Sequence, residues 1–155
     1  MHLVKRHLIE QVLSSEDRDA ISNAIQRVEQ LTSGEIKVVV RERRHLGEKR
    51  LTLEKMAVRE FHHLKLSKTR DRTGILFFLL LSERKFHIIA DEGIHRKVSE
   101  GTWDRVADSM SAEFKKGRYR EGITHGVELV GKILSEKFPR EASGRNQISD
   151  RVIVD

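Results

Sequence analysis

The sequence has no cysteine and a single proline among its 155 residues. Without cysteine, the chain cannot use disulfides, thiolate catalysis, or zinc and iron–sulfur sites with cysteine ligands, and many classes of enzyme are thereby excluded. Aromatic residues are also few, with six Phe, one Tyr and one Trp. The length is nevertheless sufficient for one domain to bury a core without disulfides or metals as staples.

A long hydrophobic run is also missing. The longest apolar stretch extends from Ile75 to Leu81, whereas a bilayer-spanning helix needs roughly 20 residues. The segment Met1 to Arg6 contains no hydrophobic region of the kind found in signal peptides. We therefore expect a soluble, cytoplasmic protein with no transmembrane segment.

Charge of both signs is abundant, because 35% of the residues are charged against 37% that are hydrophobic. The net charge of +6 could favour a polyanionic partner, but the basic residues are interspersed with 24 acids. No basic motif with interleaved aromatic residues is present. We therefore do not expect nucleic acid as the partner.

Helical periodicity begins after residue 14. Ser14 and Asp17 have the spacing of a capping box, which predicts a helix start at residue 15. The apolar stripe of this helix is formed by Ile21, Ile25, Val28 and Leu31. A β-branched strand at 35–41, a polar and basic loop at 41–51, and a second amphipathic helix at 53–64 follow, in the order of half a βαβ unit.

A hydrophobic β-hairpin is predicted at 74–91. Residues 75–81 are apolar at every position, so this strand should be buried on both faces at the centre of the sheet. Ser82 to Lys85 form a polar turn, after which Phe86, Ile88 and Ala90 alternate on one face of the next strand.

Two further amphipathic helices, at 103–114 and 123–138, complete an α/β pattern. The pattern predicts an N-terminal extension at 1–14, one α/β domain at 15–138 and a tail at 139–155. Pro139 should end regular structure, and the tail should be partly ordered at most.

Strand directions bring three loops together. A βαβ crossover makes the first two strands parallel, and the hairpin makes the third antiparallel to the second. Residues 91–93, which leave the third strand, should therefore lie beside residues 32–35 and 70–74, which enter the other two. We call these three glycine-bearing loops the glycine rim.

The glycine rim combines acids with arginines. Carboxylate oxygens are suitable ligands for Ca²⁺ or Mg²⁺, and such a cation beside guanidinium groups would suit a phosphate site. The candidate metal ligands are Glu35, Asp71, Asp91 and Glu92, and the candidate phosphate-binding side chains are Arg70 and Arg72. The alternative is that these acids and arginines only form salt bridges on the solvated surface.

Established catalytic motifs do not appear elsewhere. The chain has no phosphate-binding GxxxxGK[ST] loop, no GxSxG nucleophile elbow and no DxD pair after a strand. His62 and His63 lack the HExxH spacing, and adjacent residues on a helix point in different directions. We interpret them as a surface pair.

Several local strings resemble the TPM domain family over about residues 15 to 155. The resemblance rests on segments 28–36, 69–76 and 88–94, on the helical region from Trp103 to Gly122, and on Phe138-Pro139 followed by residues 146–150. It implies a three-layer α-β-α sandwich around a small mixed sheet with a central antiparallel hairpin. Acid phosphatase activity has been proposed for some members of this family, and the binding of divalent cations has been proposed for some. The export signal and transmembrane tail common in the family are not expected here.

Two functions remain open at this point. The first is a non-catalytic module whose rim binds a divalent cation or the charged segment of a protein partner, and we prefer it. The second is a metal-assisted acid phosphatase acting on small phosphate monoesters through a bound water. In that alternative Asp91 and Asp71 hold the cation, Glu92 or Glu35 is a ligand or general base, and Arg70 or Arg72 binds the phosphate.

Overall fold

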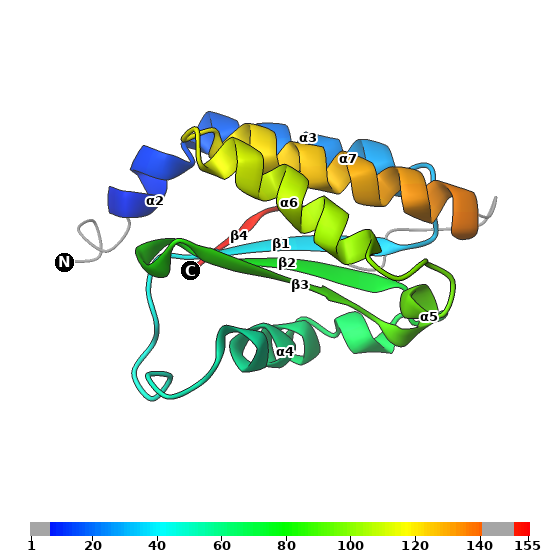
Figure 1. The fold of residues 1–155 in the computed structure, drawn as a ribbon, viewed down its shortest axis with the longest axis horizontal. Coiled ribbons are helices and arrows are strands. Elements are labelled where there is room, and N and C mark those ends of the chain that lie inside the picture. Colours follow the sequence, from blue (N-terminus) through cyan, green and yellow to red (C-terminus); the bar gives the residue numbers. More distant parts are fainter. Residues whose placement is uncertain (1–6, 141–150) are drawn as a thin grey trace.

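A four-stranded mixed sheet lies at the centre of the fold, in the order β3-β2-β1-β4 (Figure 1). The computed structural model describes residues 7–140 and 151–155. The strands are β1 (Glu35–Arg41), β2 (Gly74–Leu80), β3 (Lys85–Ala90) and β4 (Ile153–Val154).

The strand directions agree with the prediction. β1 and β2 are parallel, with Glu35 opposite Gly74, and β2 and β3 are antiparallel, with Ile75 opposite Ala90. Every residue of β2 is buried, as its continuous apolar sequence predicts. The hairpin turns through the 3₁₀ helix η2 (Leu81–Glu83), where Arg84 adopts a left-handed conformation.

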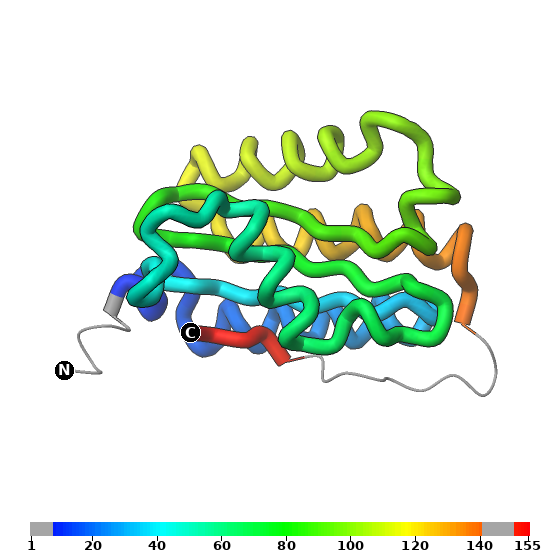
Figure 2. The backbone as a smooth tube through the Cα atoms, turned by 90° about the horizontal axis from the view of Figure 1, so that it is seen from below, coloured from blue at the N-terminus to red at the C-terminus, as the bar shows by residue number. Residues whose placement is uncertain are grey.

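Helices cover both faces of the sheet, which confirms the three-layer α-β-α architecture. Helices α3 (Ser15–Glu29), α6 (Thr102–Phe114) and α7 (Tyr119–Lys137) lie on one face, and α4 (Leu53–His63) lies across the other (Figures 1 and 2). Successive side chains of β2 alternate between the two cores, so that Phe77 packs toward the three helices and Phe78 toward α4.

Short helices connect or extend these layers. They are α2 (His7–Val12), η1 (Leu66–Lys68) and α5 (Glu92–His95), the last of which follows β3 directly. Ile9 and Leu13 are buried in the core, so the segment predicted as an N-terminal extension contributes to the packing of the domain. No helix within the described ranges is long and apolar enough to cross a bilayer.

The first long helix begins as predicted but ends earlier. Ser14 Oγ accepts a hydrogen bond from Asp17 N at 3.2 Å, and Asp17 Oδ2 accepts one from Ser14 N at 2.9 Å, which confirms the capping box. The assignment of Leu31 to the apolar stripe was wrong, because Leu31 is 63% exposed. Since α3 ends at Glu29, Leu31 has left the helical register that buries Val28.

The tail corrects the expectation that regular structure ends at Pro139. Pro139 itself forms an isolated bridge with Thr32, and β4 pairs in parallel with β1, where Ile153 lies opposite Val39. A two-residue strand carries too little periodicity to be recognised from sequence. Residues 141–150, including part of the string that carried the family resemblance, lie outside the described residues.

Candidate functional site

The three loops of the glycine rim are joined through their backbones. Glu35 N donates to Thr73 O at 3.1 Å, Asp91 N to Gly74 O at 2.9 Å, and Gly93 N to Arg72 O at 3.0 Å. The prediction that these loops meet at one end of the sheet is therefore confirmed.

Gly93 permits the closest of these approaches. A Cβ atom at this position would lie 2.3 Å from the carbonyl oxygen of Asp71 and 2.6 Å from that of Arg72. Both neighbours are backbone atoms, which cannot rotate away as a side chain could. Because Gly93 has no side chain, α5 can pack closely against the loop that precedes β2.

Arg72 and Asp91 form a bidentate ion pair at the centre of the rim. Arg72 Nε donates to Asp91 Oδ2 at 3.0 Å and Arg72 Nη2 donates to Asp91 Oδ1 at 2.9 Å. The Asp91 side chain is 6% exposed and that of Arg72 is 53% exposed. The hydrogen bond that Arg72 donates to Asp91 raises the pKa of Arg72, so this side chain remains a cation.

The backbone on both sides of this pair is constrained. Arg72 has a left-handed conformation with φ of 58°, which is uncommon for a residue other than glycine. Asp91 is the N-cap of α5, and its Oδ1 also accepts a hydrogen bond from Glu92 N at 2.7 Å. The guanidinium group is therefore held in one place while half of it faces solvent.

Arg96 extends the rim and was missed by sequence reasoning. Its Nη2 donates to Glu92 Oε1 at 2.6 Å, and Glu92 Oε2 lies 3.9 Å from Arg72 Nη1. Glu92 thus stands between two arginines. The available sequence signal was the spacing of four residues between Glu92 and Arg96 on a helix.

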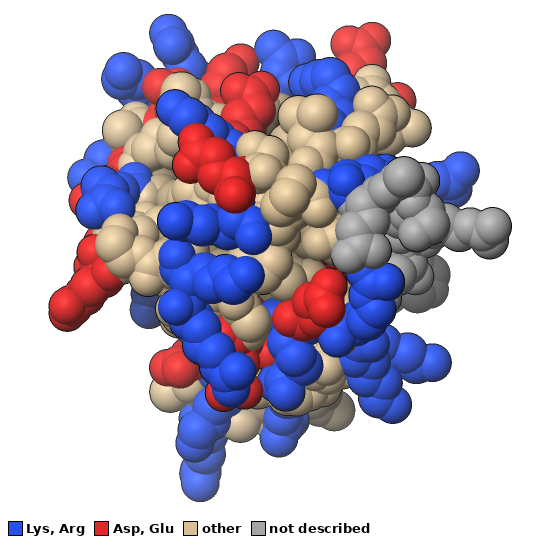
Figure 3. All heavy atoms as spheres, turned by 90° about the vertical axis from the view of Figure 1, so that its right-hand side faces the viewer, with Lys and Arg blue, Asp and Glu red and all other residues tan. Residues whose placement is uncertain are grey.

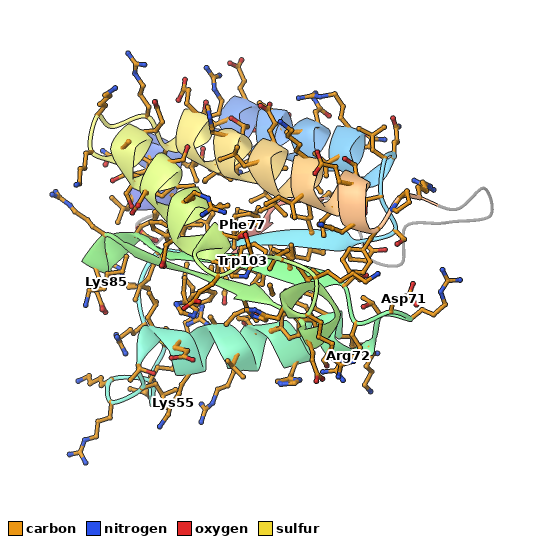
Figure 4. The ribbon with its side chains drawn as sticks, turned by 45° about the vertical axis from the view of Figure 1, so that its right-hand side comes forward. Lys55, Asp71, Arg72, Phe77, Lys85 and Trp103 are labelled. Carbon is orange, nitrogen blue, oxygen red and sulfur yellow. The ribbon has the colours of Figure 1, made fainter. Side chains whose placement is uncertain are left out.

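The other predicted residues take different positions. Asp71 lies at the outer tip of its loop, away from the sheet (Figure 4), and Arg70 lies beside it with its Nε 3.6 Å from Asp71 Oδ2. Glu35 is buried, at 2% exposure, and shares with Val39 the face of β1 that is turned toward α4. The structure therefore groups Arg72, Asp91 and Glu92, places Arg70 and Asp71 outside this group, and buries Glu35.

The positions of these side chains limit the ligands that the rim can bind. In the described part of the chain, no three acidic or histidine side chains form a group that could hold a metal ion. The ligand set Glu35, Asp71, Asp91 and Glu92 stays a prediction. The rim does present fixed charges of both signs, and Figure 3 shows Lys and Arg side chains in a band down this end of the molecule.

A second charged cluster lies at the opposite end of the sheet, where sequence reasoning had placed only a basic loop. Arg41 at the end of β1 has a side chain that is 4% exposed, and three carboxylates surround it. Its Nη1 is 2.6 Å from Glu48 Oε1, its Nη2 is 3.5 Å from Glu60 Oε1, and its Nε is 3.3 Å from Asp155 Oδ2. We call this cluster, together with Arg44 and Glu83, the arginine clamp.

Arg44 closes the loop between β1 and α4. Its guanidinium pairs with Glu83 through both oxygens, one of them 3.1 Å from Nη2, and its Nη1 donates to the carbonyls of Glu48 and Leu51 at 2.7 Å each. The hydrogen bond from Arg44 lowers the pKa of Glu83. Burial raises the pKa of Glu48, but hydrogen bonds from His45 N and Arg41 outweigh it and lower the pKa overall.

The chain is similar in sequence to one protein family and in fold to several solved structures. A family model described as the TPM domain matches residues 9–133, which is more than half of the chain. A search of the curated proteins found no match.

Several solved structures are similar, and three examples span a range of identity. The BA42 protein of the psychrophilic bacterium Bizionia argentinensis is 28% identical, with a TM-score of 0.83 over 92% of this chain and 95% of that one. The N-terminal domain of a protein from P. gingivalis is 21% identical, with a TM-score of 0.66 over 82% of this chain and 79% of that chain. The N-terminal domain of the cg2496 protein from Corynebacterium glutamicum is 17% identical, with a TM-score of 0.59 over 87% and 81%. The last two similarities concern the fold alone.

Proposed function

The chain belongs to the TPM domain family, and we propose that its domain is a binding module whose glycine rim receives an acidic segment of a protein partner. The fixed guanidinium group of Arg72 is the feature that supports this proposal. Asp91 holds it in a bidentate pair, and its outer half is open to solvent.

A fixed and exposed guanidinium favours binding for a physical reason. Ordering a long flexible side chain on association costs about 0.5–1.5 kcal/mol, and here the contact with Asp91 has already ordered it. Guanidinium groups bind carboxylates through paired N–H donors. Arg70 and Arg96, both exposed, flank Arg72 and add positive charge at the same end of the sheet.

A titration with model peptides tests the proposal. A short oligo-glutamate peptide, added to ¹⁵N-labelled protein, should shift the amide signals of residues 70–73 and 91–96, and the shifts should diminish at high salt. An oligo-glutamine peptide of the same length should leave these signals in place. Arg72→Gln should weaken the glutamate peptide about tenfold, whereas Arg59→Gln on the exposed face of α4 should not.

Two outcomes would contradict rim binding. One is a set of shifts that avoids the rim altogether, and the other is an equal loss of affinity in the Arg72 and Arg59 variants. A hydrolysis assay tests the phosphatase alternative. With p-nitrophenyl phosphate and Mg²⁺, Ca²⁺ or chelator, we expect no turnover above buffer. Metal-dependent turnover that disappears in Asp91→Asn would replace the binding module with an enzyme.

A divalent cation is the second candidate occupant of the rim. Asp91 and Glu92 are adjacent in the chain, and the next residue, Gly93, packs directly on the carbonyl oxygens of Asp71 and Arg72, so this segment of the rim offers both carboxylate and carbonyl oxygens. Such oxygens are what Ca²⁺ selects. Calorimetric titration with CaCl₂ and MgCl₂ tests this candidate, and the absence of both heat and any change in melting temperature would remove it.

A further inference from the structure

A groove lies beside the glycine rim, on the face of the sheet that α3, α6 and α7 cover. It is bounded by the connection that leads from α5 into α6, by the first turns of α6, and by the C-terminal half of α7, and its volume is about 680 Å³. Small-molecule sites in proteins commonly have volumes of roughly 300–1,000 Å³. The groove therefore has the size of a ligand site.

The floor of the groove is aliphatic. Its aliphatic residues are Val106, which is buried in the core, and the half-buried Val98, Leu129 and Ile133. Ser99 and Thr102 are the uncharged polar residues of the lining. A floor of this kind offers a surface for a flat ring or a short hydrocarbon portion of a ligand.

The edges of the groove are cationic. Five basic side chains line it, against the single carboxylate of Glu136, and these are Arg96, Lys97, Arg105, Lys132 and Lys137. They come from three separate segments, and the cationic band in Figure 3 covers this end of the molecule. Like charges held this close raise the local positive potential and attract a multiply charged anion.

Most of these cations have no acidic partner. Arg96 pairs with Glu92 of the rim, but none of the other four forms an ion pair with any residue in the described ranges 7–140 and 151–155. Lys97 lies over the ring of Phe138, with its Nζ 4.7 Å from the ring centroid, and Arg105 donates to Thr102 Oγ1 at 3.3 Å. Lys132 and Lys137 are exposed on α7, five residues apart.

From this combination, we propose that the groove binds a small organic polyphosphate: a nucleotide-sized molecule with two or more phosphate groups and a flat or apolar portion. The phosphates would lie against the lysines and arginines at the edge, since ammonium groups act as point charges and guanidinium groups as forked donors for phosphate oxygens. The ring would lie against the aliphatic floor. This site is separate from the partner site on the rim and meets it only at Arg96.

Calorimetric titration with adenine nucleotides provides the test. ATP, ADP, AMP and adenosine present the same ring with decreasing charge, and inorganic pyrophosphate presents charge without a ring. We expect affinity to fall in the order ATP, ADP, AMP, with no measurable binding of adenosine and weaker binding of pyrophosphate than of ADP. Raising the salt concentration should weaken ATP binding, because screening acts on exposed charges.

Paired variants locate the site. Lys132→Gln with Lys137→Gln should reduce the affinity for ATP about tenfold, because two phosphate contacts are lost. Lys49→Gln with Lys55→Gln removes the same charge on the α4 side of the molecule (Figure 4, Lys55) and should leave the affinity unchanged. Melting curves of both variants should match the wild type, since all four lysines are exposed. Arg72→Gln should also bind ATP normally, which separates this site from the one on the rim.

Several results would overturn the proposal. These are the absence of heat with ATP at millimolar concentration, an equal loss of affinity in the two double-lysine variants, and adenosine binding as tightly as ATP. A further measurement needs no variant: ATP-induced amide shifts in the wild type should fall on residues 96–106 and 129–137, and shifts elsewhere would remove the site. Tighter binding of a single-stranded oligonucleotide, or of vesicles containing phosphoinositides, would assign the groove to a macromolecular or membrane phosphate instead.

Discussion

The two ends of the sheet both pair arginines with acids, but they do so in different environments. At the arginine clamp, Arg41 is buried among three carboxylates, and the loop after β1 closes over it. At the glycine rim, Asp91 is buried, but Arg72 and the neighbouring Glu92 are each about half exposed to solvent.

The difference concerns which surface each ion pair leaves accessible. Each of the three guanidinium nitrogens of Arg41 lies within 4 Å of a carboxylate oxygen of this chain, so the clamp has a structural role in closing the loop. The rim instead fixes a cation whose outer side is open, and the basic groove continues from it through Arg96. Similar residue types thus close a loop at one end of the sheet and leave a fixed cation accessible to solvent at the other.

Arg41→Met should produce the largest change. Removing one member of a buried ion pair leaves the other charge uncompensated, at a cost of about 3 kcal/mol in the free energy of unfolding. Arg72→Met should cost less, because Arg72 is half exposed. Urea denaturation of the two variants measures both values. A larger loss for Arg72 than for Arg41 would reverse the roles assigned to the two ends.

Gly93→Ala should have the next largest effect and act on the rim. The new Cβ would collide with two backbone carbonyls, and overpacking of this kind costs about 2 kcal/mol. Gly117→Ala is the control: Gly117 has φ of 75° but no atom within 4 Å of a Cβ, so only the cost of a left-handed backbone conformation, about 1 kcal/mol, applies. Thermal melts should rank the two variants in this order, and equal melting temperatures would mean that α5 can move away from the loop.

Acidification should loosen the clamp. The pKa values of Glu48 and Glu83 are lowered in the folded protein, so the unfolded chain binds protons more readily there. This contribution to stability is complete above the unfolded pKa of about 4.3 and is lost as the pH falls through the folded values. Melting temperatures measured from neutral pH down to about pH 3 should therefore fall steeply below about pH 4.

Glu48→Gln should flatten this acid-induced decline, because the variant has one less carboxylate to protonate in the clamp. Glu54→Gln, a substitution at an exposed carboxylate in the first turn of α4, should leave the decline as steep as in the wild type. If both variants follow the wild-type curve, the acid sensitivity arises outside the clamp.

Arg72→Gln should have the smallest effect on global stability and a local effect on dynamics. Without the bidentate pair, α5 loses its side-chain connection to residues 70–74 and keeps only the backbone hydrogen bonds of Asp91 N to Gly74 O and of Gly93 N to Arg72 O. Hydrogen exchange at residues 92–95 should become faster, while the amides of β2 keep their protection. Unchanged exchange in α5 would show that Gly93 packing alone holds the helix.

Much of the architecture could be predicted because its signals are local. The capping box of Ser14 and Asp17, the continuous apolar strand at 75–81 and the alternation of Phe86, Ile88 and Ala90 each depend on neighbours within a few residues. Strand directions then followed from connection lengths, and they placed the three rim loops together.

The composition of the candidate site could be predicted only in part. Asp91 and Arg72 were named as candidates, but their direct pairing depends on how α5 docks, which Gly93 controls. Arg96 was missed because it is the C-cap of a four-residue helix, which is too short to show periodicity. Arg41 was missed because its partners include Glu60 and Asp155, which are far away in the chain.

The sequence by itself determined the order of the four long helices and of β1, β2 and β3, the two faces of the sheet and the end at which the glycine loops meet, because hydrophobic periodicity and connection length act over short distances. Only the tertiary structure decided which charges become buried and which stay accessible. Burial depends on which segments pack against a residue, and these segments can be remote in the chain. Asp155 contacts Arg41, β4 pairs with β1, and α7 faces the first turns of α6 across the basic groove.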